Sequence, residues 1–320
     1  MGLAHLLFSR EAQGDRVIKV LWKDMFQRKK IEPTEDGEIL LPDETIPFGL
    51  DQKRPLELDV YNPRDGKKEH TCILFVTGGG FRENHQRGFG SIYYCRKLTE
   101  AGFVVISVDY RRRLSLISKL WQGSISKTIS LFEQAIMMAT EDLMRATRHV
   151  IDNANYLSIN PNRIYLLGSS AGAIASLQSD FERCNHSKLA QKYLPEGFRY
   201  AGILSFSGAI FSRTSLTYPL DIPAPTLLVH GEDDIIVPYR QIKLFRIGFY
   251  GSKRLSRLFR KRHYVYHFIH YAKEGHIASG RYLANLNDSI AFIQAVETGQ
   301  HFEIEEQRLD DEVQHAIHQS

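Results

Sequence analysis

The stretch Arg-Ile-Tyr-Leu-Leu-Gly-Ser-Ser-Ala-Gly-Ala, residues 163–173, decides the fold. It begins as an apolar, strand-like run, reaches Gly-x-Ser-x-Gly, and is followed by residues 173–178, which favour a helix. A strand that turns sharply into a helix at this motif is a nucleophile elbow with Ser170 at its tip. The two glycines are expected because the turn is too tight for a side chain at either position. We therefore predict an exposed Ser170 hydroxyl and an Ala171 N–H that faces an oxyanion.

The same motif alone also fits a small-residue turn that has no catalytic function. The rest of the chain therefore has to supply the other parts of an active site.

The 320 residues are 43% hydrophobic and 24% charged, which fits one large α/β domain or two smaller ones. A net charge of +4 is too small to indicate nucleic acid binding. Cys72, Cys95 and Cys184 are too few and too far apart for a disulfide framework or a metal site.

No run in the chain approaches the ~20 apolar residues of a membrane span. The N-terminal run from Leu3 to Phe8 is too short for the core of a signal peptide, and no basic residue precedes it. The cysteine usage suits a reducing compartment. We therefore expect a soluble, cytoplasmic protein.

The N-terminal part of the chain, residues 1–45, is predicted to be a helical extension. Apolar pairs recur there every four residues, which predicts an amphipathic helix: Val17, Ile18, Leu21, Trp22, Met25 and Phe26. A helix packed on the flank of the domain is the favoured interpretation, and a lid or a membrane-touching helix is the alternative. Residues 46–320 are then expected to form one catalytic domain.

Buried strands alternate with helical segments after residue 46. Residues 46–61 are expected to form edge strands, and a long helix is predicted from Ile129 to about Tyr156. Nearly continuous apolar runs, typical of strands buried on both faces, occupy residues 71–76, 104–109, 203–207 and 226–230. The predicted fold class is α/β, with a mostly parallel central sheet and helices on both faces.

The strand at residues 71–76 leads into Thr-Gly-Gly-Gly-Phe, residues 77–81. Consecutive glycines leave their backbone N–H groups unshielded, so a substrate oxygen can approach Gly79 and Gly80 closely. A phosphate-binding loop is disfavoured because no Lys-Ser/Thr pair follows the glycines.

An acid and a base are expected after later strands. The strand that ends at His230 is followed by Glu232, Asp233 and Asp234, at a position where open α/β sheets form their sites. His276 is expected on a loop just past another β-rich run, residues 263–271, from which it can reach towards the elbow. The other histidines near these strands are interpreted as structural: His230, His263, His267 and His270.

Together these motifs resemble the α/β-hydrolase superfamily, in particular its carboxylesterase/lipase branch, over roughly residues 46–295. Residues 77–81 resemble the family's His-Gly-Gly-Gly-Phe/Trp motif, and residues 168–172 its Gly-x-Ser-Ala-Gly elbow. Residues 230–238 resemble its His-Gly-x-x-Asp-x-x-Val-Pro acid loop, which selects Asp234 over Asp233. Thr77 departs from the motif's histidine, and Ser169 from its usual acidic residue or histidine.

The resemblance implies cleavage of a small-molecule ester through an acyl-enzyme, without a cofactor or a metal. Ser170 would attack the carbonyl, His276 would transfer the proton and Asp234 would orient the imidazole. The N–H groups of Gly79, Gly80 and Ala171 would hold the oxyanion. An amidase or peptidase on the same fold, and a hydrolase-fold binding protein without turnover, remain as alternatives.

Two basic segments stand outside this scheme. Residues 253–262 interleave six Lys or Arg residues with Leu255, Leu258 and Phe259, in an interval between Asp234 and His276 that is longer than a minimal domain needs. A solvated insertion is favoured there, and peripheral membrane contact through a basic amphipathic helix is the alternative. Residues 111–113, three arginines, are interpreted as a solvated loop rather than as a site for an acidic substrate.

Overall fold

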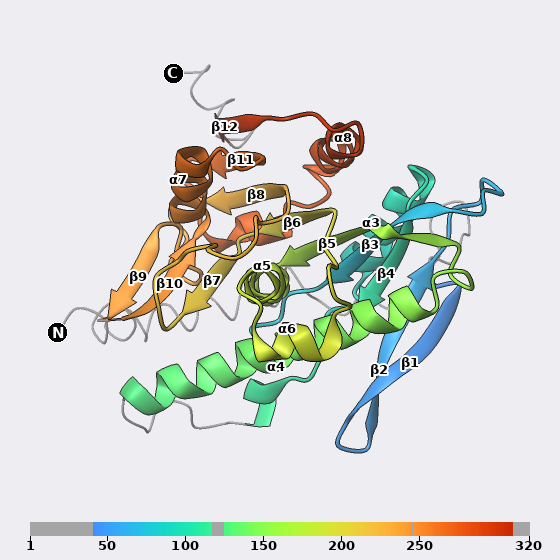
Figure 1. The fold of residues 1–320 in the computed structure, drawn as a ribbon, viewed down its shortest axis with the longest axis horizontal. Coiled ribbons are helices and arrows are strands. Elements are labelled where there is room, and N and C mark those ends of the chain that lie inside the picture. The colour runs from blue at the N-terminus through green and yellow to red at the C-terminus, as the bar shows by residue number, and fades with distance from the viewer. Residues whose placement is uncertain (1–40, 117–124, 245, 310–320) are drawn as a thin grey trace.

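The computed structural model describes residues 41–116, 125–244 and 246–309 (Figure 1). The helix predicted at residues 17–26, and with it nearly all of the proposed N-terminal extension, lies outside the described residues. Within them, no helix combines the length and the apolar character that a membrane crossing requires.

A nine-stranded sheet forms the centre of the molecule, in the order β1-β2-β4-β3-β5-β6-β8-β11-β12. Strands β1 and β2 are antiparallel at one edge, β2 is antiparallel to β4, and all the following pairs are parallel. The prediction of a mostly parallel sheet is therefore confirmed. The strand bounds are β1 Glu44–Asp51, β2 Arg54–Tyr61, β3 His70–Val76, β4 Val104–Val108, β5 Ile159–Ser169, β6 Gly202–Phe206, β8 Thr226–Gly231, β11 Tyr266–Tyr271 and β12 Glu303–Arg308.

Helices cover both faces of this sheet, as the apolar runs predicted (Figure 1). Alternate residues of β5 enter different cores: Ile164 and Leu166 pack on one face, and Tyr165 and Leu167 on the other. The first core includes residues of α4, α5 and α7, and the second includes residues of α3 and α8. The helix bounds are α3 Phe89–Glu100, α4 Ile125–Asp152, α5 Ala171–Cys184, α6 Lys188–Tyr193, α7 Ser252–Arg262 and α8 Leu286–Glu297, with short 3₁₀ turns η1 Arg113–Leu116 and η3 His276–Gly280.

Two predicted boundaries were wrong for local reasons. The long helix α4 ends at Asp152, four residues before Tyr156, where the Asn153 side chain donates to the His149 carbonyl (Nδ2–O 2.8 Å). His263 does not lie in a strand: with φ 54° it is the left-handed cap that ends α7. Strand β11 consequently begins three residues later than the apolar pattern suggested.

A small antiparallel sheet, which the sequence did not predict, combines one strand from before the acid loop with two strands from after it. It has the strand order β7-β10-β9, with β7 at Ala209–Ser212, β9 at Gln241–Leu244 and β10 at Ile247–Gly251. The β10 end is packed tightly, because a Cβ on Gly251 would lie 1.6 Å from the Pro238 carbonyl oxygen. Strands β9 and β10 of this sheet connect the acid loop to the start of α7.

The basic segment 253–262 is not a solvated insertion, because it forms most of helix α7 on the connection between β8 and β11. These strands are parallel neighbours, and parallel neighbours require a crossover connection, usually a helix. Leu255, Leu258 and Phe259 are buried in the core. These apolar side chains are therefore not available to enter a membrane, and any membrane contact would have to use the charged face of α7.

The arginines at residues 111–113 are also more than a solvated loop. The Arg111 guanidinium donates to both carboxylate oxygens of Asp142 (Nε–O 2.9 Å), and its backbone N–H donates to the same group at 2.8 Å. Arg111 also contacts Glu141, at a distance of 2.9 Å. The segment after β4 is thus tied to α4.

Leu255→Ala tests whether α7 is part of the core. We expect it to lower the free energy of unfolding by about 2–5 kcal/mol, because it removes a fully buried side chain. The exposed Arg257→Ala on the same helix is the control and should change it by less than about 0.5 kcal/mol. Urea unfolding of both variants measures the difference, and equally small effects would contradict the assignment.

Candidate active site

The nucleophile elbow lies where β5 ends at Ser169 and α5 begins at Ala171. Ser170 stands between them with φ 52° and ψ −117°, a backbone conformation that non-glycine residues rarely adopt. Its N–H donates to the Phe206 carbonyl at 2.8 Å, and its own carbonyl accepts from Ile174 at 2.9 Å. The strained residue is therefore held by the neighbouring strand on one side and by the first helical turn on the other.

Both glycines of the motif are required by close backbone contacts, which confirms the predicted tight turn. A Cβ on Gly168 would lie 2.4 Å from the Gly172 carbonyl oxygen, across the elbow itself. A Cβ on Gly172 would lie 1.9 Å from the carbonyl oxygen of Val76, at the end of β3. The first turn of α5 thus packs backbone to backbone against the strand that leads into the glycine loop.

The structure brings together the three side chains that the sequence singled out. Ser170 Oγ lies 2.8 Å from His276 Nε2, and His276 Nδ1 lies 2.7 Å from Asp234 Oδ2. An ionised carboxylate only accepts hydrogen bonds, so we assign the imidazole proton to Nδ1. Nε2 is then free to accept the Ser170 proton, which is the arrangement a general base requires.

Asp234 is buried, yet several donors satisfy its carboxylate. Its Oδ1 accepts from the backbone N–H groups of Ile236 and Val237, both at 2.9 Å. Its Oδ2 lies near His276 Nδ1 and 3.2 Å from His230 Nε2. Burial by itself raises the pKa of Asp234, but the hydrogen bonds from His230 and His276 outweigh it and hold the pKa well below its usual range. The group therefore stays ionised at neutral pH.

His230 contacts the acid of the site, which the sequence interpretation did not predict. It was predicted to be structural, and it is fully buried, with Nδ1 2.8 Å from Ser252 Oγ and Nε2 3.2 Å from the Val237 carbonyl. It also contacts Asp234, four residues along the chain. This four-residue spacing, from the end of β8 into the acid loop, was the sequence signal that could have predicted the contact. The neighbouring Asp233 is exposed, and Glu232 instead lies 2.6 Å from His270 Nδ1.

The loops that carry the acid and the base pack directly against each other. A Cβ on Gly231 would lie 2.3 Å from the Gly275 carbonyl oxygen, and the Asp233 N–H donates to the Glu274 carbonyl at 2.8 Å. His276 does not sit in an irregular loop as expected, because it opens the 3₁₀ turn η3. Ser169, which departs from the family motif, donates to the Ser279 carbonyl in that turn (Oγ–O 2.7 Å) and so joins the elbow to η3.

The glycine loop lies beside the serine. Strands β3 and β5 are parallel neighbours, with Val76 opposite Gly168, and a Cβ on Gly78 would lie 3.1 Å from Ser170 Cβ. Gly79 has φ 137° and Gly80 φ 59°, conformations that favour glycine. Within the described ranges, neither of these two amides donates a backbone hydrogen bond outside the strands and helices.

The described residues contain no group of three or more His, Cys, Asp or Glu side chains that could hold a metal ion.

Three exposed isoleucines neighbour the acid and the base in the sequence. Ile235 and Ile236 follow Asp234, and Ile277 follows His276, with exposed fractions of 72%, 42% and 51%. Exposed apolar residues thus directly follow the acid and the base in the chain.

Two family models match this chain. A family model described as phospholipase/carboxylesterase matches residues 123–290, just over half of the chain. The chain belongs to the phospholipase/carboxylesterase family. A second model, BD-FAE, matches residues 58–119, the part that contains the glycine loop. The α/β-hydrolase resemblance is therefore confirmed.

Several curated relatives carry esterase names. A probable isoprenylcysteine alpha-carbonyl methylesterase from Oryza sativa subsp. japonica is 34% identical over 116 residues, covering 36% of this chain and 23% of that protein. An isoprenylcysteine alpha-carbonyl methylesterase from Arabidopsis thaliana is 32% identical over 129 residues, covering 40% and 25%. The chain thus matches about a quarter of the length of these relatives.

The fold also matches a solved esterase. Thermogutta terrifontis esterase 2, phosphonylated by cyclosarin, superposes with a TM-score of 0.56 at 18% identity, covering 84% of this chain and 98% of that chain. Its butyrate-bound structure gives a TM-score of 0.55 at 17% identity, with 83% and 96% covered. At this identity the likeness shows the shared α/β-hydrolase fold.

Gly172→Ala tests the backbone contact behind the elbow. Its new methyl group would meet the Val76 carbonyl, which cannot rotate away, so we expect a loss of at least ~3 kcal/mol of stability. Gly299→Ala is the control, because that glycine has φ 70° but open space around it, and it should cost about 1–2 kcal/mol from backbone strain alone. Thermal and urea unfolding measure both, and equal costs would contradict the packing argument.

The low pKa of Asp234 predicts how stability depends on pH. A carboxyl whose folded-state pKa is depressed stabilises the protein above its unfolded-state pKa of about 3.9, and this contribution is lost as the pH falls towards the folded value. The stability difference between the wild type and Asp234→Asn should therefore shrink as the pH falls from about 6 to about 3. Urea unfolding at a series of pH values measures it, and a constant difference would show that Asp234 is not specially stabilised as the anion.

Proposed function

We propose that this protein is a serine hydrolase that cleaves carboxylic esters through an acyl-enzyme. The observation that carries the proposal is the continuous contact from Ser170 through His276 to Asp234, at 2.8 and 2.7 Å, at an elbow next to a glycine loop. A strained serine, a base within hydrogen-bond reach and a buried carboxylate behind the base are the parts of an activated nucleophile.

In the first half of the reaction, Ser170 Oγ attacks the ester carbonyl carbon as its proton moves to His276 Nε2. Asp234 stabilises the resulting imidazolium through Nδ1–H, without taking the proton itself. The carbonyl oxygen becomes an oxyanion, and the N–H groups of Gly79, Gly80 and Ala171 hold it. When the tetrahedral intermediate collapses, the bond to the alkoxy group breaks and His276 gives its proton to the departing alcohol.

In the second half, water replaces the alcohol. His276 takes a proton from the water, whose oxygen attacks the acyl carbon of the acyl-enzyme, and a second oxyanion forms at the same N–H groups. Collapse of this intermediate breaks the bond to Ser170 Oγ, and the imidazolium returns the proton to it. The products are a carboxylic acid, an alcohol and the free enzyme, so these steps need no further reactant.

The proposed substrate is a small-molecule ester with an apolar group next to the carbonyl. The exposed Ile235, Ile236 and Ile277 would bury part of that group beside the acid and the base. The relatives named as isoprenylcysteine methylesterases support an ester with an apolar part. An amidase or peptidase would use the same triad, so the leaving group has to be tested directly.

Ser170→Ala tests the assignment of the nucleophile. It removes the attacking oxygen, so we expect kcat/KM for p-nitrophenyl acetate and butyrate to fall by ~10⁴-fold or more. A fluorophosphonate probe should label the wild type at Ser170, as located by mass spectrometry, and should not label the variant. Ser256→Ala is the control, because that hydroxyl donates to the Lys253 carbonyl (3.2 Å) within α7, away from the triad.

The outcomes separate the candidate functions. Labelling at Ser170 together with turnover of p-nitrophenyl and methyl esters supports the esterase. Labelling with turnover of anilides but not of esters would favour an amidase or peptidase. A wild type that is neither labelled nor active on either class would be a binding protein with this fold, and the proposal would fail.

A further inference from the structure

The glycine loop is closed by a contact between its two ends. Thr77 stands where the resembled motif has a histidine, and its hydroxyl donates to Asn84 Oδ1 (Oγ1–Oδ1 3.2 Å), seven residues later. Between these residues the turn folds on itself, because the Gly79 carbonyl accepts from the N–H groups of Arg82 and Glu83, both at 3.0 Å. The segment that carries the Gly79 and Gly80 amides is therefore clasped at both ends by two side chains.

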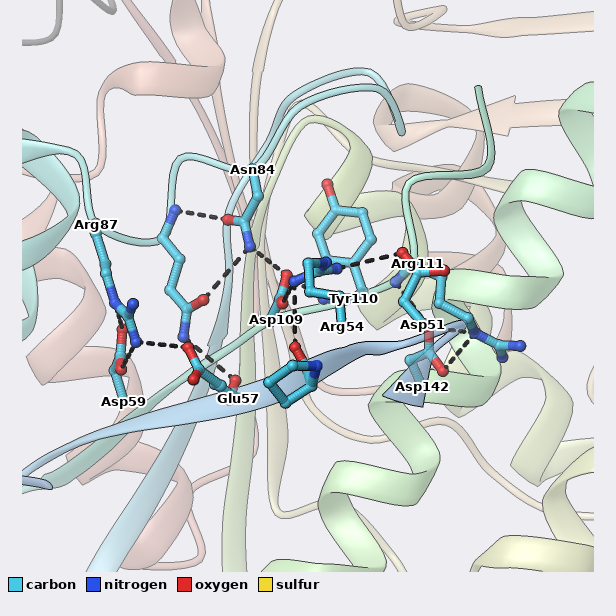
Figure 2. Close-up of polar contacts among 12 residues, drawn as sticks. Asp51, Arg54, Glu57, Asp59, Asn84, Arg87, Asp109, Tyr110, Arg111 and Asp142 are labelled. Carbon is cyan, nitrogen blue, oxygen red and sulfur yellow. Dashed lines mark hydrogen bonds and ion pairs between the residues drawn. The ribbon is translucent and has the colours of Figure 1, made fainter. Parts of the chain in front are cut away.

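Both the oxygen and the nitrogen of the Asn84 side-chain amide form hydrogen bonds. Its Oδ1 also accepts from the backbone N–H of Gln86 at 2.7 Å, and its Nδ2 donates to Asp109 Oδ1 and to Gln86 Oε1, the latter at 3.4 Å (Figure 2). A carboxylate faces one end of the amide and N–H and O–H donors face the other, so its orientation follows from its partners. No other residue type offers an acceptor and a donor at these two places with the same short side chain.

Asp109 connects this clasp to the sheet. It follows β4, the parallel neighbour of β3, and only 3% of its surface is exposed. Its carboxylate accepts from Asn84 Nδ2, from the Tyr110 N–H at 2.9 Å and from the Arg54 guanidinium of β2 (Figure 2). These donors hold the buried Asp109 carboxylate in one position, because leaving a buried donor or the carboxylate unpaired is costly.

A second contact holds the start of the turn. The Tyr110 hydroxyl donates to the Thr77 carbonyl at 3.1 Å, and the Phe81 ring lies edge-on to the Tyr110 ring, with 6.3 Å between their centroids. The Phe81 carbonyl accepts from the Leu114 N–H at 3.0 Å. The residues around the end of β4 therefore support the turn from its outer side.

We propose that Asn84 is a positioning residue for the oxyanion hole, acting through Thr77 and Asp109. The inference rests on the proposed function, because it assigns to Asn84 the task of aiming the Gly79 and Gly80 amides at the oxyanion. Donors stabilise a developing charge only when they are already in place, so a turn with three positive-φ residues in a row, Gly79, Gly80 and Phe81, needs such a brace. In this chain the Thr77–Asn84–Asp109 contacts provide it.

Two test variants and two controls separate positioning of the oxyanion hole from a general effect on folding. Thr77→Val removes one hydroxyl and keeps the shape, whereas Thr77→Ser keeps the hydroxyl and is the matched rescue. Asn84→Ala removes the clasp. Asn153→Ala is the control, a half-buried asparagine that bonds the His149 carbonyl (Nδ2–O 2.8 Å) just after the end of α4.

We expect Asn84→Ala and Thr77→Val to lower kcat for p-nitrophenyl acetate by ~10- to 100-fold with little change in KM, because misplaced donors weaken the transition state most. Affinity for a trifluoromethyl ketone, which forms the tetrahedral adduct with Ser170, should fall by the same factor. Thr77→Ser and Asn153→Ala should retain both values within about threefold. Lower Tm with unchanged kcat and ketone affinity would overturn the proposal, because it would show a purely structural role.

Amide hydrogen exchange provides a readout that does not depend on turnover. Peptides covering residues 78–83 should exchange at least ~10-fold faster in Asn84→Ala than in the wild type, while peptides from β5 and α5 stay unchanged. Faster exchange in a protein without esterase activity would support the brace and contradict the proposed function. Unchanged exchange over residues 78–83 would overturn the brace, whatever the activity.

Discussion

The active-site region depends on one close backbone contact, between Gly172 at the start of α5 and the Val76 carbonyl at the end of β3. A single Cβ at Gly172 would lie 1.9 Å from that oxygen, so only glycine allows the helix to approach the strand. This approach places the tip of the elbow next to the segment that follows β3. The nucleophile and the glycine loop, about ninety residues apart in the chain, become neighbours because β3 and β5 pair in parallel with their carboxyl ends together.

Two buried carboxylates stabilise the site from opposite sides. Asp234 follows β8 and orients His276, whereas Asp109 follows β4 and supports the turn that carries Gly79 and Gly80. Each would be unfavourable alone in the interior. Asp234 accepts from two backbone N–H groups and Asp109 from one, and side-chain donors complete both sets of contacts. Asp234 therefore orients the base, and Asp109 holds the loop that is expected to bind the oxyanion.

Helix α7 shows how a charged sequence can conceal a core element. Its six basic residues suggested an insertion in solvent, yet Leu255, Leu258 and Phe259 pack into the core, and Lys253 and Arg260 lie near Glu305 of β12. Its first residue, Ser252, contacts His230, which in turn contacts Asp234. The crossover that joins β8 to β11 thus also lies behind the acid of the site.

The sequence by itself determined most strands of the central sheet and most candidate residues, because apolar runs, Gly-x-Ser-x-Gly and the acid-loop motif are local patterns. It located the parallel strands, the elbow at Ser170, and Asp234 and His276 as its partners. Only the tertiary structure decided which side chains meet across strand ends. The contacts of Ser169 with η3 and of Asn84 with Asp109 depend on how loops pack. Such contacts leave no local pattern, because hydrogen-bond partners at the edge of a parallel sheet come from segments that are distant in the chain.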